Sequence, residues 1–292
     1  MKRTERLNIS TVIVTHNSAH FIRRCLVSVY AQELCCQEVI VVDNGSRDAT
    51  ADFIKTHYPG VVLIENQNNL GACKARNQGI EVARGEWILT LDCDVMLERT
   101  FFMRLADTAA GLPGEVGMLQ PKILNADQET IYSAGILLSG LRRFYDIGRG
   151  RLDGAAFKEA RYIYGACAAS AAYRRAMLND TKEPTGYFDE RFFFLVEDVD
   201  ISCRAQQKGW RALFCPEAVC FHDGNSSLTG APMRQYLSWR NRRLFLAKQR
   251  IPVFTKAIRY ACYDFWRLIF LFFANPYVRR ALRSPGLDVF PS

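Results

Sequence analysis

Short apolar runs alternate with amphipathic segments through the first hundred residues of the chain. The runs are rich in Val, Ile and Leu and lie at residues 9–15, 39–43, 61–65 and 87–91. The segments between them predict helices over residues 20–32, 49–58 and 71–84. Continuous apolar strands that alternate with helices are typical of a parallel sheet covered on both faces, so we predict an α/β fold.

The pattern is less regular after residue 95. It predicts a helix over 101–110, strands over 116–123 and 131–141, a Gly- and Arg-rich mobile loop over 142–161 and a small-residue apolar segment over 162–174. A helix over 197–207, short strands over 210–214 and 218–221, and a helical region from residue 233 follow. We interpret this as one α/β domain over 1–232, with halves of about 8–95 and 96–232, and an extension over 233–292.

The extension combines an apolar stripe with a concentration of positive charge. Its apolar residues recur at spacings of three and four, at Ile258, Ala261, Cys262, Phe265, Ile269, Phe272 and Phe273. Basic residues stand on another face, at Lys256, Arg259 and Arg267. Residues 232–292 carry 12 Lys and Arg against 2 acidic residues, whereas the whole chain has a net charge of +8. This asymmetry predicts an anionic partner for residues 251–292, such as a membrane surface; packing on the domain or on a second subunit is the alternative.

Other features of the sequence narrow the functional classes. No run of about 20 apolar residues occurs, and the first residues lack an apolar signal core, so we expect a cytoplasmic protein, peripheral to the membrane at most. The ten cysteines are scattered and are expected to stay reduced. No nucleic-acid-binding module is recognisable, which argues against a nucleic acid partner. No G-x-G-x-x-G follows the first strand, which argues against a dehydrogenase.

Two aspartates stand where the fourth predicted strand ends. Asp92 and Asp94 follow the apolar run at 87–91, and alternation along a strand directs both side chains to the same face. Ligands of open α/β sheets bind at the carboxyl ends of strands. Two carboxylates there can hold a hard divalent cation, which in turn can hold a diphosphate.

Several motifs in a fixed order resemble family 2 glycosyltransferases with the GT-A fold, closest to the rhamnosyltransferase-like members. They are VIVTHNS at 12–18, VVDNGSRDAT at 41–50, NLGACKARNQG at 69–79, LDCD at 91–94, EDVD at 197–200 and HDGNSS at 222–227. The resemblance covers residues 8–250. It implies a nucleotide-binding half, an acceptor-binding half and transfer of a sugar from a nucleotide-diphospho-sugar.

The resemblance implies a set of donor-binding residues in the first half. These are Thr15, His16, Asn17, Asp43, Gly71, Lys74, Arg76, Asn77, Asp92 and Cys93. Asp43 would read the base or ribose, although a carboxylate before Asn-Gly can also cap a turn. Lys74 or Arg76 would neutralise phosphate. Cys93 stands where family members often carry a third acid, and strand alternation predicts that its side chain points into the core.

Metal and catalytic residues follow from the same resemblance. Asp94 and His222 would bind Mg²⁺ or Mn²⁺ together with the diphosphate of the donor. Asp198 would accept the proton of the acceptor hydroxyl, and Glu197 would orient the reactants. Acids also favour the first turn of a helix, so capping is the alternative for this cluster, and Asp200 is expected to pair with Arg204.

The acceptor site is the least constrained part of the prediction. Ala166 and Cys167, in a small-residue run, and the aromatic Trp210 are its candidates. We expect an inverting enzyme that moves rhamnose from dTDP-rhamnose, or a sugar from a UDP-sugar, to a saccharide or lipid-linked saccharide in cell-surface polysaccharide synthesis. The alternative is an inactive nucleotide-sugar-binding or scaffold protein of the same fold. A homo-oligomer is compatible with either.

Overall fold

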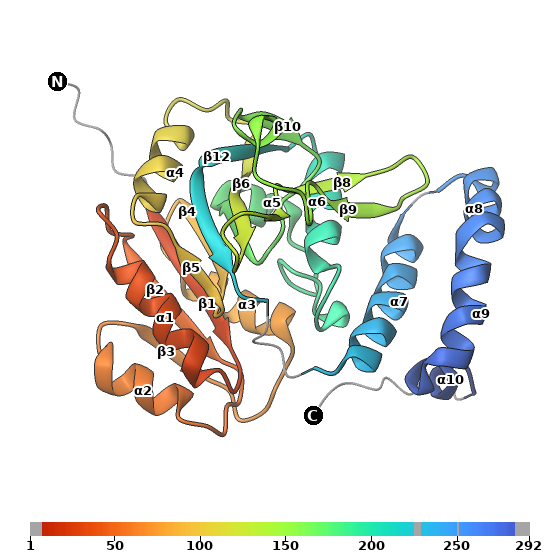
Figure 1. Cartoon of the computed structure of the whole chain (residues 1–292), viewed down its shortest axis with the longest axis horizontal. Coiled ribbons are helices and arrows are strands. Elements are labelled where there is room, and N and C mark those ends of the chain that lie inside the picture. The colour runs from red at the N-terminus through yellow and green to blue at the C-terminus, as the bar shows by residue number, and fades with distance from the viewer. Residues whose placement is uncertain (1–7, 225–228, 250, 284–292) are drawn as a thin grey trace.

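The computed structural model describes residues 8–224, 229–249 and 251–283, and its centre is one large sheet (Figure 1). Eight strands form its main path in the order β10-β12-β6-β11-β4-β1-β2-β3. Their bounds are β1 Ile9–Thr15, β2 Glu38–Asp43, β3 Val62–Glu65, β4 Trp87–Asp92, β6 Val116–Asn125, β10 Arg161–Ile163, β11 Ser170–Arg174 and β12 Arg211–His222.

Most neighbouring strands run parallel. β1 pairs in parallel with β2 and β4, β2 with β3, and β6 with β12, whereas β11 is antiparallel to both β4 and β6. The prediction of a mostly parallel sheet flanked by helices is confirmed. Parallel pairing requires helical crossovers, so the carboxyl ends of β1 and β4 meet at one edge of the sheet.

Helices cover both faces of the sheet, and strand alternation divides the core between them. Ile13 packs into the cluster with α1 (Ala19–Tyr30), α2 (Thr50–His57) and α4 (Phe101–Ala109). The adjacent Val12 packs into the other cluster, with α3 (Ala72–Val82), α5 (Arg175–Thr181) and α6 (Glu197–Gln207). Where both faces are buried, as in β1, β2 and β4, the strand is a mostly apolar run, whereas β3 and β10 at the two ends of the sheet are partly exposed.

The second half differs from its predicted elements. The predicted strand 131–141 is broken into β7 (Ile131–Ser133) and β8 (Ile136–Leu138), because Gly135 takes a positive φ of 109° between them. The mobile loop predicted over 142–161 is wrong in part, since β9 (Phe144–Asp146) pairs with β8 and the short helix η1 (Ala155–Phe157) buries Phe157.

Three more elements depart from the prediction. β5 (Val95–Leu97) and α5 were not predicted. The two strands predicted over 210–221 form one strand, β12, with an irregular register between Cys215 and Val219. The differences at β5 and β12 both arise from pairing between distant residues, because β5 pairs with the end of β12.

The C-terminal helix α7 (Ala231–Lys248) is tied to the sheet domain. Phe245 is fully buried, and Lys248 Nζ lies 2.7 Å from Glu183, 2.8 Å from Asp189 and 2.8 Å from Asp200. Among the described residues, two groups of side chains are close enough together to hold a metal ion, and these three acids form one of them. Here the Lys248 ammonium lies beside all three carboxylates. The predicted pair between Asp200 and Arg204 is also present, at 2.9 Å.

The last helices form a layer beside α7, on the side of the molecule opposite α1 and α2 (Figure 1). They are α8 (Val253–Arg259), the π-helical turn η3 (Tyr260–Asp264), α9 (Phe265–Ala274) and α10 (Pro276–Arg283). Most of the predicted apolar stripe faces outward, including Phe265, Ile269 and Phe273. The basic residues Arg259 and Arg267 face inward instead. No described helix has the length and hydropathy needed to cross a bilayer.

Candidate active site

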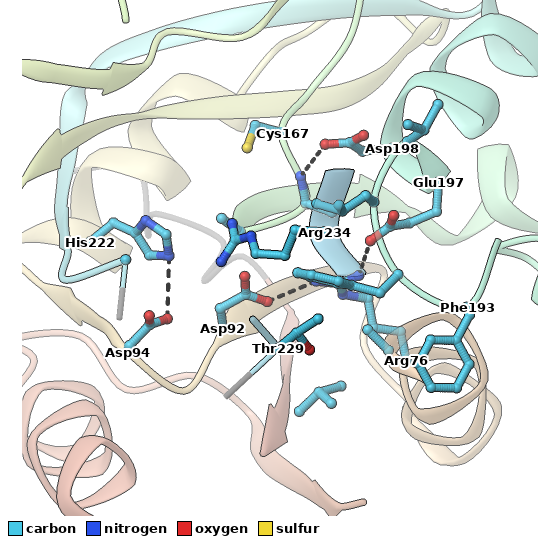
Figure 2. A pocket seen from close by; sticks show the side chains of 18 of the residues that line it. Arg76, Asp92, Asp94, Cys167, Phe193, Glu197, Asp198, His222, Thr229 and Arg234 are labelled. Atoms are coloured by element: carbon cyan, nitrogen blue, oxygen red, sulfur yellow. Dashed lines mark hydrogen bonds and ion pairs between the residues drawn. The ribbon is translucent and has the colours of Figure 1, made fainter. Parts of the chain in front are cut away.

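A cavity of about 630 Å³ opens at the carboxyl ends of β1 and β4. Its walls come from both halves of the sheet domain, from β9 and from α7. Figure 2 shows its acidic and basic side chains pointing toward one another. The predicted residues that line it are Thr15, His16, Asn17, Arg76, Asp92, Cys93, Asp94, Cys167, Glu197, Asp198 and His222.

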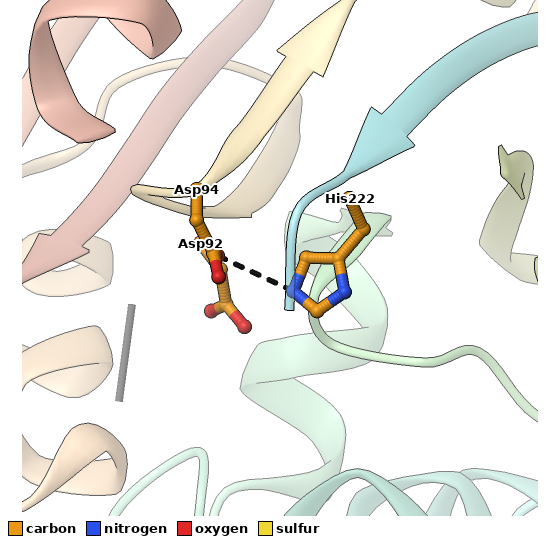
Figure 3. Close-up of side chains that lie close together, drawn as sticks. All are labelled: Asp92, Asp94 and His222. Atoms are coloured by element: carbon orange, nitrogen blue, oxygen red, sulfur yellow. Dashed lines mark ion pairs between the residues drawn. The ribbon is translucent and has the colours of Figure 1, made fainter. Parts of the chain in front are cut away.

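Strand pairing places His222 beside Asp94. His222, at the end of β12, pairs with Val95 at the start of β5, the residue after Asp94. His222 Nε2 lies 3.2 Å from Asp94 Oδ1, and both side chains are buried (Figure 3). Ligand atoms of these two residues and of Asp92 all lie within 4.8 Å of one another. Residues 225–227 of the HDGNSS motif lie outside the described residues.

The chemistry of these three side chains suits a divalent cation. Carboxylate oxygens are the ligands that Mg²⁺ and Mn²⁺ prefer, and an imidazole is compatible with Mn²⁺. A cation would also offset the repulsion between the two carboxylates, which sit in a partly dehydrated cavity. The donor set therefore fits the predicted metal, with Asp94 and His222 as ligands and Asp92 nearby.

Arg76 connects Asp92 to Glu197. It projects from α3 and donates to Asp92 Oδ1 at 2.7 Å and to Glu197 Oε1 at 2.6 Å. Although burial opposes its charge, these two acids raise the pKa of Arg76 further above its usual range. Both of these guanidinium contacts are with carboxylates, and Arg76 also lines the cavity, so its predicted contact with phosphate stays a prediction. Arg76 holds Asp92 and Glu197 in fixed positions.

Asp198 combines access to the cavity with an unusual proton affinity. Its Oδ1 accepts a hydrogen bond from the Val199 amide at 2.8 Å, and its Oδ2 accepts a long one from the Ala168 amide at 3.4 Å. Burial, followed by the charges of Glu197 and Asp146, raises its pKa to about 7. A carboxylate with a pKa near neutrality is suited to accept a proton.

This raised pKa predicts the pH dependence of the reaction. We expect the basic form of Asp198 to be the active one, so that kcat/KM rises about tenfold per pH unit below the pKa and levels off above about 7. Initial rates between pH 5 and 9 with subsaturating substrate measure this. Donor binding over the same range serves as the control. A profile that is flat from about pH 5.5 upward would contradict the assignment.

The segment before Glu197 is held in an unfavourable backbone conformation. Phe193, Leu195 and Val196 have φ values of 64°, 72° and 76°, which non-glycine residues rarely adopt. Each such residue costs about 1–3 kcal/mol, so the surroundings must stabilise the segment. The buried Asn241 on α7 does so, because its Nδ2 lies 2.8 Å from the carbonyl oxygens of Phe192 and Phe194 and 2.7 Å from that of Leu195.

Removing this amide is expected to impair catalysis more than binding. In Asn241→Ala the strained segment loses its partner, and a displaced Asp198 lowers kcat by about 10²-fold. Donor affinity should change little, because Asn241 does not line the cavity. Steady-state kinetics and calorimetric titration of the nucleotide separate the two effects. Asn179→Ala, at an exposed position of α5, is the matched control. Equal losses in kcat and donor affinity would contradict the positioning role.

The loop after β1 is built from polar contacts with the loop after β2. His16 Nδ1 lies 2.9 Å from the backbone carbonyl oxygen of Asn44, and the backbone N–H of Asn17 donates to Ser46 Oγ at 2.8 Å. Asp43 accepts hydrogen bonds from the amide and hydroxyl of Ser46 and does not line the cavity. The structure thus brings Thr15, His16 and Asn17 to the cavity and places Asp43 in the turn-capping position.

Five further predicted residues lie outside the cavity lining. On and before α3, a Cβ at Gly71 would meet Phe193, Lys74 faces Glu190, and Asn77 bonds the backbone of Phe188. Ala166 is buried in the core, and Trp210 donates its indole N–H to the exposed Asp180 at 2.8 Å. Of the acceptor candidates, Cys167 alone reaches the cavity.

Sequence reasoning missed the contribution of α7 and β9 to the cavity. Arg234, Ser238 and Arg242 line it from α7, and Tyr145 and Asp146 line it from β9. The α7 residues recur every four positions, the spacing of one helix face, and this was the available signal. This spacing shows that the three side chains share one face of the helix, but it does not show which part of the protein that face contacts.

Comparisons with known sequences identify the family of the chain. The family model of Glycosyl transferase family 2 matches residues 10–181. N-acetylglucosaminyl-diphospho-decaprenol L-rhamnosyltransferase of Mycobacterium tuberculosis is 26% identical over 267 residues, covering 82% of this chain and 83% of its own. Succinoglycan biosynthesis protein ExoO of Rhizobium meliloti is 33% identical over 125 residues, covering 42% of this chain and 36% of its own.

Solved structures share the fold. Mannosyltransferase PcManGT from Pyrobaculum calidifontis, in complex with GDP-Man and Mn²⁺, has a TM-score of 0.60 at 19% identity, covering 97% of this chain and 77% of its own. GalNAc-T7 with UDP, GalNAc and Mn²⁺ has a TM-score of 0.61 at 16% identity, covering 96% and 58%. These are GT-A glycosyltransferases, so the predicted GT-A fold is confirmed.

Proposed function

Because the chain belongs to glycosyl transferase family 2, we propose that it is an inverting, metal-dependent enzyme that moves one sugar from a nucleotide diphosphate to an acceptor hydroxyl. One observation carries this proposal. The Asp94–His222 pair and the Asp198 carboxylate line the same cavity, although they come from three separate parts of the chain.

Each residue has a role that its position supports. A divalent cation held by Asp94 and His222 would stabilise the negative charge of the departing nucleotide diphosphate. Asp198 accepts the proton of the acceptor hydroxyl. The oxygen of that hydroxyl attacks the anomeric carbon of the donor sugar as the bond from this carbon to the diphosphate breaks. Within the described residues, Glu197 Oε2 is buried without a hydrogen-bond partner, so it can accept from a substrate hydroxyl.

The curated relatives support a particular class of donor and acceptor. The Mycobacterium tuberculosis relative is named for L-rhamnosyl transfer to N-acetylglucosaminyl-diphospho-decaprenol, and the Rhizobium meliloti relative for succinoglycan biosynthesis. We therefore propose dTDP-rhamnose or a UDP-sugar as donor and a lipid-linked saccharide as acceptor, in the synthesis of a cell-surface polysaccharide.

A donor screen tests this function. dTDP-rhamnose and a panel of UDP-sugars are incubated with Mn²⁺ and N-acetylglucosamine on a short prenyl diphosphate, and nucleotide diphosphate release is measured. We expect one donor to give acceptor-dependent release that EDTA abolishes, and an inverted anomeric centre in the product by NMR. Donor binding without release in the presence of any acceptor would favour the inactive binding protein instead.

The outward face of the C-terminal helices supports contact with an anionic membrane. Trp266, Phe270 and Phe273 recur on one face of α9 with 64%, 63% and 74% of their surface exposed, and Phe254 of α8 is 75% exposed. Large apolar side chains are rarely exposed in such a contiguous group unless they contact a partner. The positive charge of residues 232–292 complements anionic lipid headgroups. Residues 284–292 lie outside the described residues.

Vesicle binding tests whether this exposed apolar face contacts the membrane. The triple variant Trp266→Ser, Phe270→Ser, Phe273→Ser is expected to bind vesicles containing phosphatidylglycerol at least about tenfold more weakly, because it loses apolar area that inserts between headgroups. Co-sedimentation measures this, with pure phosphatidylcholine vesicles as the control. Unchanged binding by the variant would contradict the proposal. A dimer that the variant dissociates would assign the face to a second copy.

A further inference from the structure

A group of arginines lies between the β8–β9 hairpin, α7 and the C-terminal helices. Arg143, Arg242 and Arg267 gather around Tyr263 of the turn η3. The guanidinium carbon of Arg143 lies 4.4 Å from the centre of the Tyr263 ring, and Arg267 donates to the Tyr263 hydroxyl at 2.7 Å. Arg242 stacks on Phe144 of the hairpin, with its guanidinium carbon 4.1 Å from the ring centre. We call Arg143, Arg242 and Arg267 the arginine cluster.

In the described ranges, the arginine cluster lacks compensating negative charge. Among the described residues, none of its members forms an ion pair, and the nearby Asp264 pairs with Arg259 at 2.8 Å instead. Within the part of the chain that the structure describes, the Nε of Arg242 is buried without a hydrogen-bond acceptor. Burial, followed by the charge of Arg267, lowers the pKa of Arg242 to about 10, which still leaves it charged at neutral pH. Gathering like charges in a partly buried place is unfavourable unless an anion joins them.

The arginine cluster borders the reaction cavity. Arg242 and Ser238 line that cavity, and Arg267 lies 3.4 Å from Ser238 Oγ. The same α9 helix that directs Arg267 inward exposes Phe270 and Phe273 on its outer side. An anion on the cluster would thus lie between the cavity that holds Asp198 and an exposed apolar surface.

We propose that the arginine cluster binds the phosphate or diphosphate group through which the acceptor saccharide is joined to its lipid. This inference rests on the proposed function and adds a subsite to it. A sugar hydroxyl extends from the cluster into the cavity toward Asp198, and the hydrocarbon chain leaves over the apolar face of α9. Guanidinium groups suit this ligand because they offer paired N–H donors to phosphate oxygens. The donor diphosphate is assigned separately, to Asp94 and His222.

Binding of geranyl diphosphate, a ten-carbon prenyl diphosphate, tests the subsite without turnover. Isothermal titration is done in EDTA with the full chain. Arg242→Gln and Arg267→Gln are each expected to weaken binding at least about tenfold, the effect of losing a charge-assisted hydrogen bond. Arg280→Gln, which removes one charge from an exposed position of α10, should change it less than about twofold, and Arg242→Lys should retain part of the affinity. Binding of UDP with Mn²⁺ confirms that the variants are folded.

Each outcome has a distinct meaning. No binding by the wild type, or equal binding by wild type and Arg242→Gln, overturns the subsite. Glycerol 3-phosphate that binds as tightly, with the same dependence on Arg242, shows a phospholipid headgroup site and also overturns the assignment to the acceptor. Arginine-dependent binding of the prenyl diphosphate supports the subsite even if the donor screen yields no transfer, in which case the proposed function alone fails.

Discussion

The Asp198→Asn variant is expected to lose about 10³-fold in kcat while it binds the donor as tightly as the wild type. The amide has the shape of the carboxylate but cannot accept the proton of the acceptor hydroxyl, and general base catalysis contributes about 10²- to 10⁴-fold. The wild-type pH dependence near 7 should also disappear from the residual activity. Single-turnover rates with saturating donor and acceptor measure the loss, and calorimetric titration measures donor affinity.

A matched control keeps this result specific. Asp107→Asn makes the same chemical change at an exposed position of α4 that does not line the cavity. It should retain full activity. If Asp198→Asn keeps more than about a tenth of the wild-type rate, another group is the base. If it loses donor binding together with turnover, Asp198 supports the donor site instead.

The Asp94→Asn variant is expected to have the second largest effect, and the effect should follow metal affinity. Loss of one of the two proposed protein ligands should weaken Mn²⁺ binding, and the cation would supply several kcal/mol of charge stabilisation, which corresponds to about 10²- to 10³-fold in rate. Millimolar Mn²⁺ should restore part of the activity. Electron paramagnetic resonance of bound Mn²⁺ and initial rates measured over a range of Mn²⁺ concentrations test both statements.

Metal removal from the wild type provides the parallel measurement. EDTA should abolish transfer, and added Mn²⁺ or Mg²⁺ should restore it. Asp107→Asn again serves as the control and should bind Mn²⁺ as the wild type does. Full activity in EDTA would contradict a metal-dependent mechanism, whereas an Asp94→Asn variant with unchanged Mn²⁺ affinity would move the metal site elsewhere.

The first half of the fold was predictable because three of its strands, β1, β2 and β4, are buried on both faces. Val12 and Ile13 enter the cores on opposite faces, so β1 contains the consecutive apolar residues 12–14 that local composition identifies. β5 and β9 were not predictable in this way. Each has three residues and forms because a distant strand end or hairpin partner lies beside it, which no local pattern records.

The residues of the candidate site also differ in whether local sequence could predict their positions. Asp92, Asp94 and the Thr15–Asn17 segment follow strands whose carboxyl ends must meet, so their convergence follows from topology. Asn77 and Trp210 lie outside the cavity lining, where their polar atoms bond Phe188 and Asp180, and no local pattern in the sequence indicates these partners. The inward orientation of Arg267 was equally inaccessible, because an amphipathic pattern shows two faces without showing which one meets solvent.

The position of Asn241 and Lys248 on α7 bears on how the protein can be shortened. Chains cut near residue 232, where the compositional change suggests a boundary, would lack the amide that holds the segment before Glu197. They would also remove the ammonium that lies beside the buried carboxylates of Asp189 and Asp200 and leave each with a single arginine partner, which is destabilising. The minimal enzyme suited to crystallisation therefore extends past residue 248, and removal of the apolar face should begin beyond that point.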